Sequence, residues 1–362
     1  MQTGFSLSRS LLGYFNGVIT LFYNPRGILT IEAISNLGIM YYVFLSGLEM
    51  NSDTILRSRK KDTSLAIAGI VTSMLFGVGF LTLQQKLLDE KVVLSQTAEK
   101  THIKAYLFWC LTLSVTGFPV LARILAKLKL LYTKLGKDAL TAAMLTDAYG
   151  WVLFTLLIPA ANNWGERYYL SVITTFLFIA FCFIVVRPIL TPIIENRTNK
   201  NMWRKSHMLH VFIGLFICSY ITDFLGTHNI VGAFVFGLIL PHGKFADMVM
   251  EMSDDFVTGI LCPVYFAGVG FKLDLPVLWR TTNSVLMMLI MVLLCTPKVL
   301  SSLIVTFFFG MPARDGLSIG LLLNTKGVMA VILQSVAWEK NVIFNYQLSI
   351  LQQSFFLLCL VI

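Results

Sequence analysis

Asp147 lies near the middle of a long apolar stretch of this sequence, residues 139–160. An ionisable side chain at membrane depth is costly, and it is usually functional. A carboxylate at that depth can bind either a proton or a metal cation, and the neighbouring Thr146 adds a neutral oxygen of the kind that hard cations accept as a ligand. We therefore expect Asp147 and Thr146 to form part of a site that exchanges a cation for a proton. The alternative is a structural carboxylate that is paired with a buried lysine or hydroxyl.

A second buried charge is expected at Lys298, which lies in the middle of another apolar stretch, residues 284–309. A buried ammonium group needs a partner or loses its proton. Asp147 is the partner that we expect for it. The alternative is that the lysine side chain extends to the membrane surface.

Two of the apolar stretches are expected to be broken helices. Gly117 and Pro119 interrupt residues 105–126, and a proline inside a helix removes a hydrogen bond and clashes with the preceding turn. A polar run interrupts residues 316–337, and it consists of Asn324, Thr325, Lys326 and Gly327. Unwound backbone in a bilayer is tolerated only where it is buried in protein or lines a cavity. Interrupted helices in two halves of a chain indicate the binding site of a transporter.

The ends of broken helices carry unpaired backbone N–H and C=O groups with opposite partial charges. We expect Lys326 to neutralise the carbonyl ends, with Asn324 and Thr325 beside it. Thr116 could satisfy freed donors or bind the ion. Polar residues that merely bend a helix are the alternative.

The composition indicates the class of protein that must position these residues. Hydrophobic residues make up 56% of the 362 residues and charged residues 13%, against about 25% charged in soluble domains. The apolar runs have the length that a helix needs to cross a bilayer, whereas a membrane β-barrel would show short alternating segments. The sequence therefore predicts an all-α polytopic membrane protein with eleven or twelve transmembrane helices. The expected spans are 5–23, 29–50, 64–85, 105–126, 139–160, 168–187, 207–222, 229–241, 257–273, 284–309, 316–337 and 347–362.

The net charge of +9 does not indicate a nucleic-acid partner, because the basic residues lie in short loops between the apolar runs. Loops 51–63, 127–138 and 187–206 are basic and fall on one side of the membrane by strict alternation, which places that side in the cytoplasm. The six cysteines have no metal-binding spacing, and no phosphate-binding loop follows a strand. We expect a transport protein without a cofactor or a metal site, and not an enzyme.

A weak internal repeat relates residues 41–50 to residues 264–273. It aligns Gly47 with Gly270 and Glu49 with Lys272, on helices that are expected to run in opposite directions. Such a pair is typical of inverted-topology transporters, so we expect one transport domain with repeat halves 1–195 and 205–362. Glu49 lies at the cytoplasmic end of its helix. It could pair with the basic loop that follows it or draw cations into a funnel.

Taken together, these segments resemble the plant cation/proton exchanger family, a branch of the monovalent cation:proton antiporter-2 group. The resemblance covers nearly the whole chain in the order of the family. Besides Lys298, the matching segments are NLGIMYYVFLSGLEMN (36–51), LSVTGFPVLARILAKLKLL (113–131), AAMLTDAYGW (142–151), GAFVFGLILPHG (232–243), CPVYFAGVGFKLDL (262–275) and GLLLNTKGVM (320–329).

The resemblance implies inverted repeats with two crossing discontinuous helices, and exchange of K⁺ or Na⁺ for H⁺ across a plasma membrane or an internal membrane. It also implies a homodimer in the lipid bilayer. It assigns the ion-binding aspartate to Asp147, the membrane lysine to Lys298, the acid of the Gly-Leu-Glu motif to Glu49 and the threonine of the break to Thr116.

Three departures from the family pattern are visible. Thr146 stands where the family has asparagine, and Ala330 stands where an acid usually follows the Asn-Thr-Lys-Gly run. The first spans and the hydrophilic C-terminal region of the family are not recognisable. The leading expectation is a K⁺/H⁺ antiporter that serves cation and pH homeostasis. A transport-inactive, truncated paralogue that regulates full-length exchangers is the alternative, and a passive cation channel is a third hypothesis.

Overall fold

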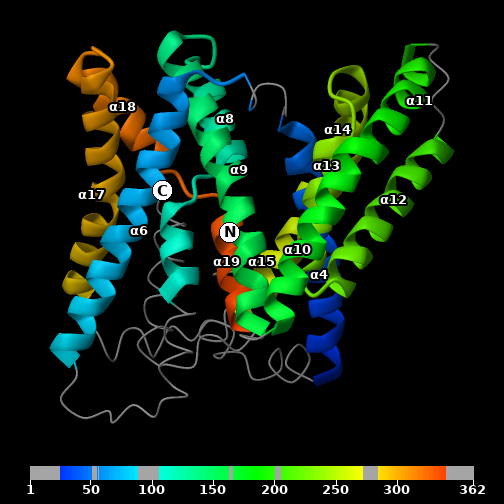
Figure 1. The fold of residues 1–362 in the computed structure, drawn as a ribbon, viewed down its shortest axis with the longest axis horizontal. Helices are drawn as coiled ribbons and strands as arrows, with labels where there is room; N and C mark the ends of the chain where they lie inside the picture. Colours follow the sequence, from blue (N-terminus) through cyan, green and yellow to red (C-terminus); the bar gives the residue numbers. More distant parts are fainter. Residues whose placement is uncertain are drawn as a thin grey trace. The chain divides into compact units, whose positions relative to one another are not determined.

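The structure is a computed structural model that describes residues 25–50, 55, 57–88, 106–162, 166–199, 205–271 and 284–339. Every regular element in these ranges is a helix (Figure 1). Five of the helices are long and apolar enough to cross a membrane, and a bent pair would make a sixth span. The prediction of an all-α, multi-pass integral membrane protein is confirmed. The predicted spans 5–23 and 347–362 lie outside the described residues.

The chain divides into two compact units, each assembled from two separate segments of the sequence. Unit 1 comprises Met1–Ser52 and Asn162–Leu275, and unit 2 comprises Asp53–Ala161 and Pro276–Ile362. Asp147, Lys298 and Lys326 belong to unit 2, whereas Glu49 and Lys272 belong to unit 1.

Unit 2 contains the two predicted breaks. Residues 106–114 are helical, residues 115–117 are not, and helix α8 then begins at Phe118. Pro119 lies in the first turn of α8, where its missing N–H costs no helical hydrogen bond. The second break spans residues 324–327 and bends the chain by 43°. Both breaks therefore fall where the sequence predicted them.

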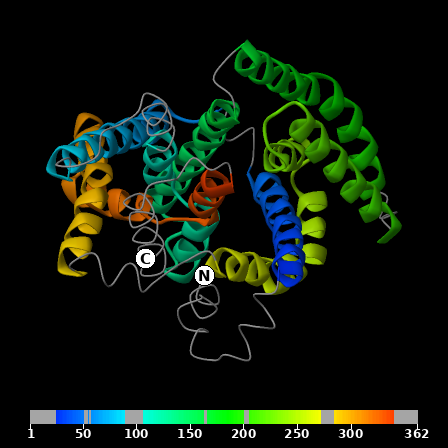
Figure 2. The ribbon, with the colours of Figure 1, turned by 90° about the horizontal axis from the view of Figure 1, so that it is seen from below.

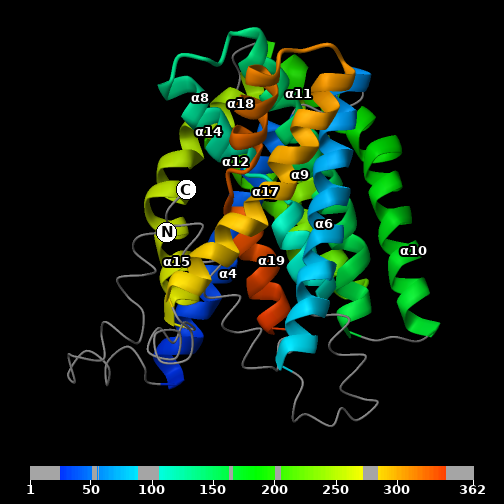
Figure 3. The ribbon, with the colours of Figure 1, turned by 90° about the vertical axis from the view of Figure 1, so that its left-hand side faces the viewer.

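The remaining helices of unit 2 surround these breaks. Helix α17 packs against both α6 and α18 (Figure 3). The helices of the unit are α6 (Lys60–Leu88), α8 (Phe118–Lys127), α9 (Lys134–Asn162), α17 (Ser284–Phe308), α18 (Ala313–Leu323) and α19 (Val328–Glu339).

Unit 1 is built around α4, which packs against both α13 and α15 (Figure 2). A Cβ atom at Gly237 of α13 would lie 2.3 Å from the carbonyl oxygen of Phe44 in α4, so the two backbones approach closely only because glycine is present. The helices of the unit are α4 (Pro25–Glu49), α10 (Glu166–Phe181), α11 (Arg187–Asn199), α12 (Lys205–Phe224), α13 (Asn229–Ile239), α14 (Lys244–Phe256) and α15 (Cys262–Phe271).

Two π-helical segments in unit 1 correct the predicted boundaries. Segment η1 (Cys182–Val186) joins α10 to α11, and η2 (Val257–Leu261) joins α14 to α15. A proline follows two residues after each segment, Pro188 and Pro263. The wider π turn makes room for a proline ring that would otherwise clash with the carbonyl four residues earlier. The predicted loop 187–206 is therefore helical as far as Asn199.

Helix α14 was not predicted, because it does not resemble a membrane span. It is amphipathic, with Phe245, Ala246 and Val249 buried and an acidic exposed side. A search for long apolar runs passes over such a helix, because its average hydrophobicity is low.

Candidate functional site

The Asp147 carboxylate is held by backbone N–H groups at the start of α8. Its Oδ1 accepts the N–H of Thr116 at 3.2 Å, and its Oδ2 accepts the N–H of Phe118 at 2.8 Å. These donors have no partner within α8, and the N-terminus of a helix carries a partial positive charge. Only 5% of Asp147 is exposed. The break thus provides the carboxylate with two fixed donors in a buried position.

Lys326 occupies the opposite kind of helix end. Its Nζ donates to the carbonyl oxygens of Leu113 and Val115, where helix 106–114 ends. These carbonyls lack helical partners and carry the negative end of the helix dipole. Lys326 therefore lies at a carbonyl end, as the sequence analysis expected, and its neutralising role stays a prediction.

Lys298 of α17 reaches the same helix end. Its Nζ donates to the carbonyl oxygen of Ser114 and to Oγ1 of Thr116, both at 2.7 Å. The expected ion pair with Asp147 is not formed in the structure, so the pairing of the two charges stays a prediction. The physical reason is that the unpaired carbonyl end offers the ammonium group acceptors, while the carboxylate is already bound by the N–H groups across the break.

The two breaks contact each other through their backbones (Figure 1). The N–H of Gly117 donates to the carbonyl oxygen of Thr325 at 3.0 Å. A Cβ atom at Gly117 would lie 2.5 Å from Cα of Gly327, so neither position accommodates a side chain at this crossing. The hydroxyl of Thr116 donates to the carbonyl oxygen of Leu323 at 3.2 Å and closes the crossing on its other side.

The other polar residues of the second break have local partners. Asn324 donates through Nδ2 to the carbonyl oxygen of Cys295 in α17 at 2.9 Å, which ties the break to the helix that carries Lys298. The hydroxyl of Thr325 donates to the carbonyl oxygen of Leu322, three residues earlier, at 2.9 Å. Asn324 is therefore a structural link at the crossing, and the role of Thr325 comes from its backbone carbonyl.

Within unit 2, one predicted site residue, Thr146, is not a hydrogen-bond partner of the carboxylate. The Thr146 hydroxyl donates to the carbonyl oxygen of Ala142, one turn earlier in α9, at 2.8 Å. Glu49 is the last residue of α4 in unit 1 and is exposed. Residues next to each other on a helix point to different faces, which is why adjacency to Asp147 does not make Thr146 its partner.

The groups that sequence reasoning missed are all backbone atoms. The N–H of Phe118 and the carbonyl oxygens of Leu113, Ser114 and Val115 hold the three charged side chains. Backbone groups have no residue-type signature, so the only available signal was the break itself.

The arrangement can hold one exchangeable positive charge. Asp147 is a carboxylate with two N–H donors, which stabilise its charge without cancelling it. The two lysines are bound to the carbonyl end of the other half-helix. Within the described part of the chain, no group of three or more His, Cys, Asp or Glu side chains could hold a metal ion. A proton or a weakly held cation with oxygen ligands fits the site better than a resident transition metal.

Thr116 and Thr146 allow a matched test of this geometry. Thr116→Val keeps the side-chain volume but leaves the Leu323 carbonyl without its donor and removes an acceptor from Lys298. We expect it to lower the free energy of unfolding by about 1–3 kcal/mol and to slow any exchange through Asp147. Thr146→Val removes only a hydroxyl that is bound to its own helix, so it should change little. Thermal unfolding in detergent checks both variants, and an equal loss in the two would contradict the assignment.

Comparison with known proteins places the chain among transporters. The family described as "Sodium/hydrogen exchanger, transmembrane" matches residues 1–362. Cation/H(+) antiporter 15 of Arabidopsis thaliana is 35% identical over 343 residues, which cover 94% of this chain and 41% of that protein. Cation/H(+) antiporter 20 of the same plant is 32% identical over 360 residues, or 96% of this chain and 42% of that protein.

A yeast protein is also similar. K(+)/H(+) antiporter 1 of Saccharomyces cerevisiae is 27% identical over 351 residues, which cover 94% of this chain and 39% of that protein. The chain therefore spans about two fifths of the length of these curated relatives.

Proposed function

The chain belongs to the sodium/hydrogen exchanger family, and from this premise we propose that it exchanges a monovalent cation for a proton at Asp147. The observation that carries the proposal is the buried Asp147 carboxylate at the crossing of two broken helices. Its two backbone donors stabilise the ionised form, yet the net negative charge still requires a counter-charge in a low-dielectric interior. Either a proton or a cation supplies that charge, so the two compete for one group.

Thr116 connects the Asp147 carboxylate to the ammonium group of Lys298. Its backbone N–H donates to Asp147, and its Oγ1 accepts from Lys298. We propose that Lys298 leaves the carbonyl end and approaches the carboxylate when no cation is bound there. Lys326 stays on its two carbonyl oxygens and preserves the crossing. A single exchangeable carboxylate gives one proton for one cation, which makes the exchange electroneutral.

Movement of the site between the two sides of the membrane follows from the proposed repeats. We propose that the halves 1–195 and 205–362 are inverted repeats, each of which contributes one of the breaks. Glu49 would draw cations toward the site from the cytoplasmic side. A homodimer in the bilayer is proposed from the family resemblance.

We propose K⁺ as the preferred cation and Na⁺ as the second. Support comes from the resemblance to plant cation/proton exchangers and from the name of the yeast relative, K(+)/H(+) antiporter 1.

The test is cation-driven proton movement in proteoliposomes that contain the purified chain and a pH-sensitive dye. An outward proton gradient should collapse on addition of K⁺, more slowly on addition of Na⁺, and not on addition of N-methylglucamine. Valinomycin with equal potassium on both sides of the membrane clamps the membrane potential near zero, and the rate of Na⁺-driven proton movement should then be unchanged if exchange is electroneutral. Correctly inserted protein that moves no protons with any cation would contradict the proposal, and a large cation current would favour a channel.

A further inference from the structure

Lys129, just after the end of helix α8, has a backbone conformation that is unusual for a lysine. The N–H of Leu130 donates to the carbonyl oxygen of Leu125, and the N–H of Lys129 donates to that of Ala126, which together form a Schellman motif. Lys129 occupies the left-handed position of this motif with φ 56°. Glycine is favoured at this position because a Cβ atom is strained there. Among the described residues, Lys129 is the only non-glycine residue with positive φ.

The segment that follows Lys129 is held firmly. The backbone N–H of Thr133 donates to Leu130, and the Thr133 hydroxyl accepts the N–H of Gly136 at 3.1 Å as an N-cap of α9. A Cβ atom at Gly136 would lie 2.0 Å from the carbonyl oxygen of Leu130, so the turn is closely packed. The connection between α8 and α9 is thus preorganised at both ends.

This connection presents charged and apolar side chains together. Leu128 is 58% exposed and Tyr132 is 85% exposed. Exposed lysines alternate with them and continue into α9, and we call the whole set the basic loop surface: Lys127, Leu128, Lys129, Tyr132, Lys134 and Lys137.

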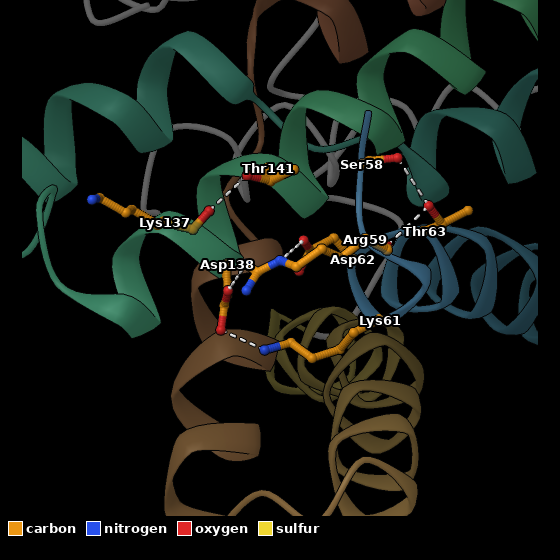
Figure 4. A network of polar contacts seen from close by, with 8 residues as sticks. All are labelled: Ser58, Arg59, Lys61, Asp62, Thr63, Lys137, Asp138 and Thr141. Atoms are coloured by element: carbon orange, nitrogen blue, oxygen red, sulfur yellow. Dashed lines mark hydrogen bonds and ion pairs between the residues drawn. The ribbon is translucent and has the colours of Figure 1, made fainter. Parts of the chain in front are cut away.

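The nearby acids do not neutralise these lysines. Asp138 is buried, and its two oxygens accept from Arg59 and Lys61 at the start of α6 (Figure 4). Asp62 accepts from Arg59 at 3.2 Å. The ammonium group of Lys137 points away from Asp138 in this view. In the described part of unit 2, the lysines of the basic loop surface make no ion pair, so the surface keeps its positive charge.

We propose that the basic loop surface lies in the headgroup layer and binds the phosphate groups of anionic lipids. A cluster of lysines next to membrane spans is attracted to anionic lipid, and the exposed Leu128 and Tyr132 fit the boundary between headgroups and acyl chains. Lys129 supports the assignment because a lysine is present where glycine would suit the backbone better. A charge that is retained at a conformational cost indicates a role for that charge.

The binding would reach the ion site through the chain itself. The loop joins α8, which begins at the N–H donors of Asp147, to α9, which carries Asp147. A lipid bound there restrains both helices from their cytoplasmic ends. This coupling adds lipid dependence to the exchange, but the binding claim stands without any transport measurement.

Lys129→Gly gives a variant that should fold. Removing a strained Cβ should leave the melting temperature of the protein unchanged or higher. Its affinity for phosphatidylserine, measured by native mass spectrometry of the full chain in detergent, should fall about fivefold, the usual share of one lysine near an anionic surface. The matched control is Lys244→Gln, which removes an exposed lysine of unit 1 and should bind as the wild type does.

Three further measurements distinguish binding of an anionic lipid from binding of any lipid or any anion. Phosphatidylcholine should bind more weakly than phosphatidylserine, and inorganic phosphate should not compete at equal concentration. Lys127→Gln combined with Lys134→Gln should lower phosphatidylserine affinity further. The proposal fails if Lys129→Gly binds phosphatidylserine like the wild type, if the two lipids bind equally, or if inorganic phosphate displaces the lipid, because the loop would then be a simple anion site.

Discussion

Asp147→Asn is expected to abolish cation-driven proton movement while the protein remains folded. Asparagine has nearly the same volume, and its carbonyl oxygen can still accept one of the two N–H groups that hold the aspartate. It cannot bind a proton at accessible pH or supply a negative charge for a cation. The initial rate of K⁺-driven dye response in proteoliposomes should therefore fall to the level of protein-free vesicles.

Asp138→Asn is the control for this variant. Asp138 is another buried carboxylate of α9, but its partners are Arg59 and Lys61 rather than the crossing. Loss of these ion pairs should lower stability, and exchange should still depend on cation concentration. A full exchange rate in Asp147→Asn would show that the shared site lies elsewhere, and the mechanism proposed above would then be wrong.

Gly327→Ala is expected to disrupt the crossing of the two breaks through a single added methyl group. The new Cβ atom would lie 2.5 Å from Cα of Gly117, and backbone atoms on both sides cannot rotate away as a side chain can. Overpacking that forces the backbone to move typically costs about 1–3 kcal/mol. The displacement would separate the two breaks and disturb the N–H donors of Asp147. We expect a lower melting temperature in detergent and no exchange.

Gly79→Ala is the matched control, because a Cβ atom at Gly79 of α6 meets nothing within 4 Å. Alanine is also the better helix former by about 1 kcal/mol. The melting temperature and exchange rate of the Gly79→Ala variant should equal or exceed those of the wild type. If Gly327→Ala behaved like Gly79→Ala, the close crossing of the two breaks would not exist in the membrane.

The parts of the site that the sequence predicted are those with a distinctive residue type. Asp147, Lys298 and Lys326 are charges in apolar surroundings, and Pro119 and Gly327 are helix breakers, so burial and breaks could be inferred from their identity alone. The pairing of these charges could not be inferred. Lys298 contacts Ser114 and Thr116 instead of Asp147. The acceptor on Ser114 is a backbone carbonyl oxygen at the end of a helix, and the sequence does not show which carbonyl oxygens lack a helical partner.

The errors in the predicted helix boundaries also come from interactions that the sequence does not show. The loop predicted after residue 187 is helical, because a π segment accommodates Pro188 and the apolar residues continue. Helix α14 was missed because it buries only one side. Hydropathy predicts which segments enter the bilayer, whereas hydrogen bonds that compensate a proline and amphipathic packing depend on neighbours in three dimensions.

The most direct test of the central claim is to count the protons that K⁺ releases from the purified protein. Weakly buffered protein in detergent is titrated with KCl across a pH series, with N-methylglucamine chloride as the ionic-strength control, and the released protons are compared with bound K⁺. Competition at one carboxylate predicts release approaching one proton per bound cation on the acidic side of the series, falling toward none at alkaline pH, and no release from Asp147→Asn. Equal release from Asp147→Asn, or cation binding without proton release at every pH, would contradict a site shared by the two ions.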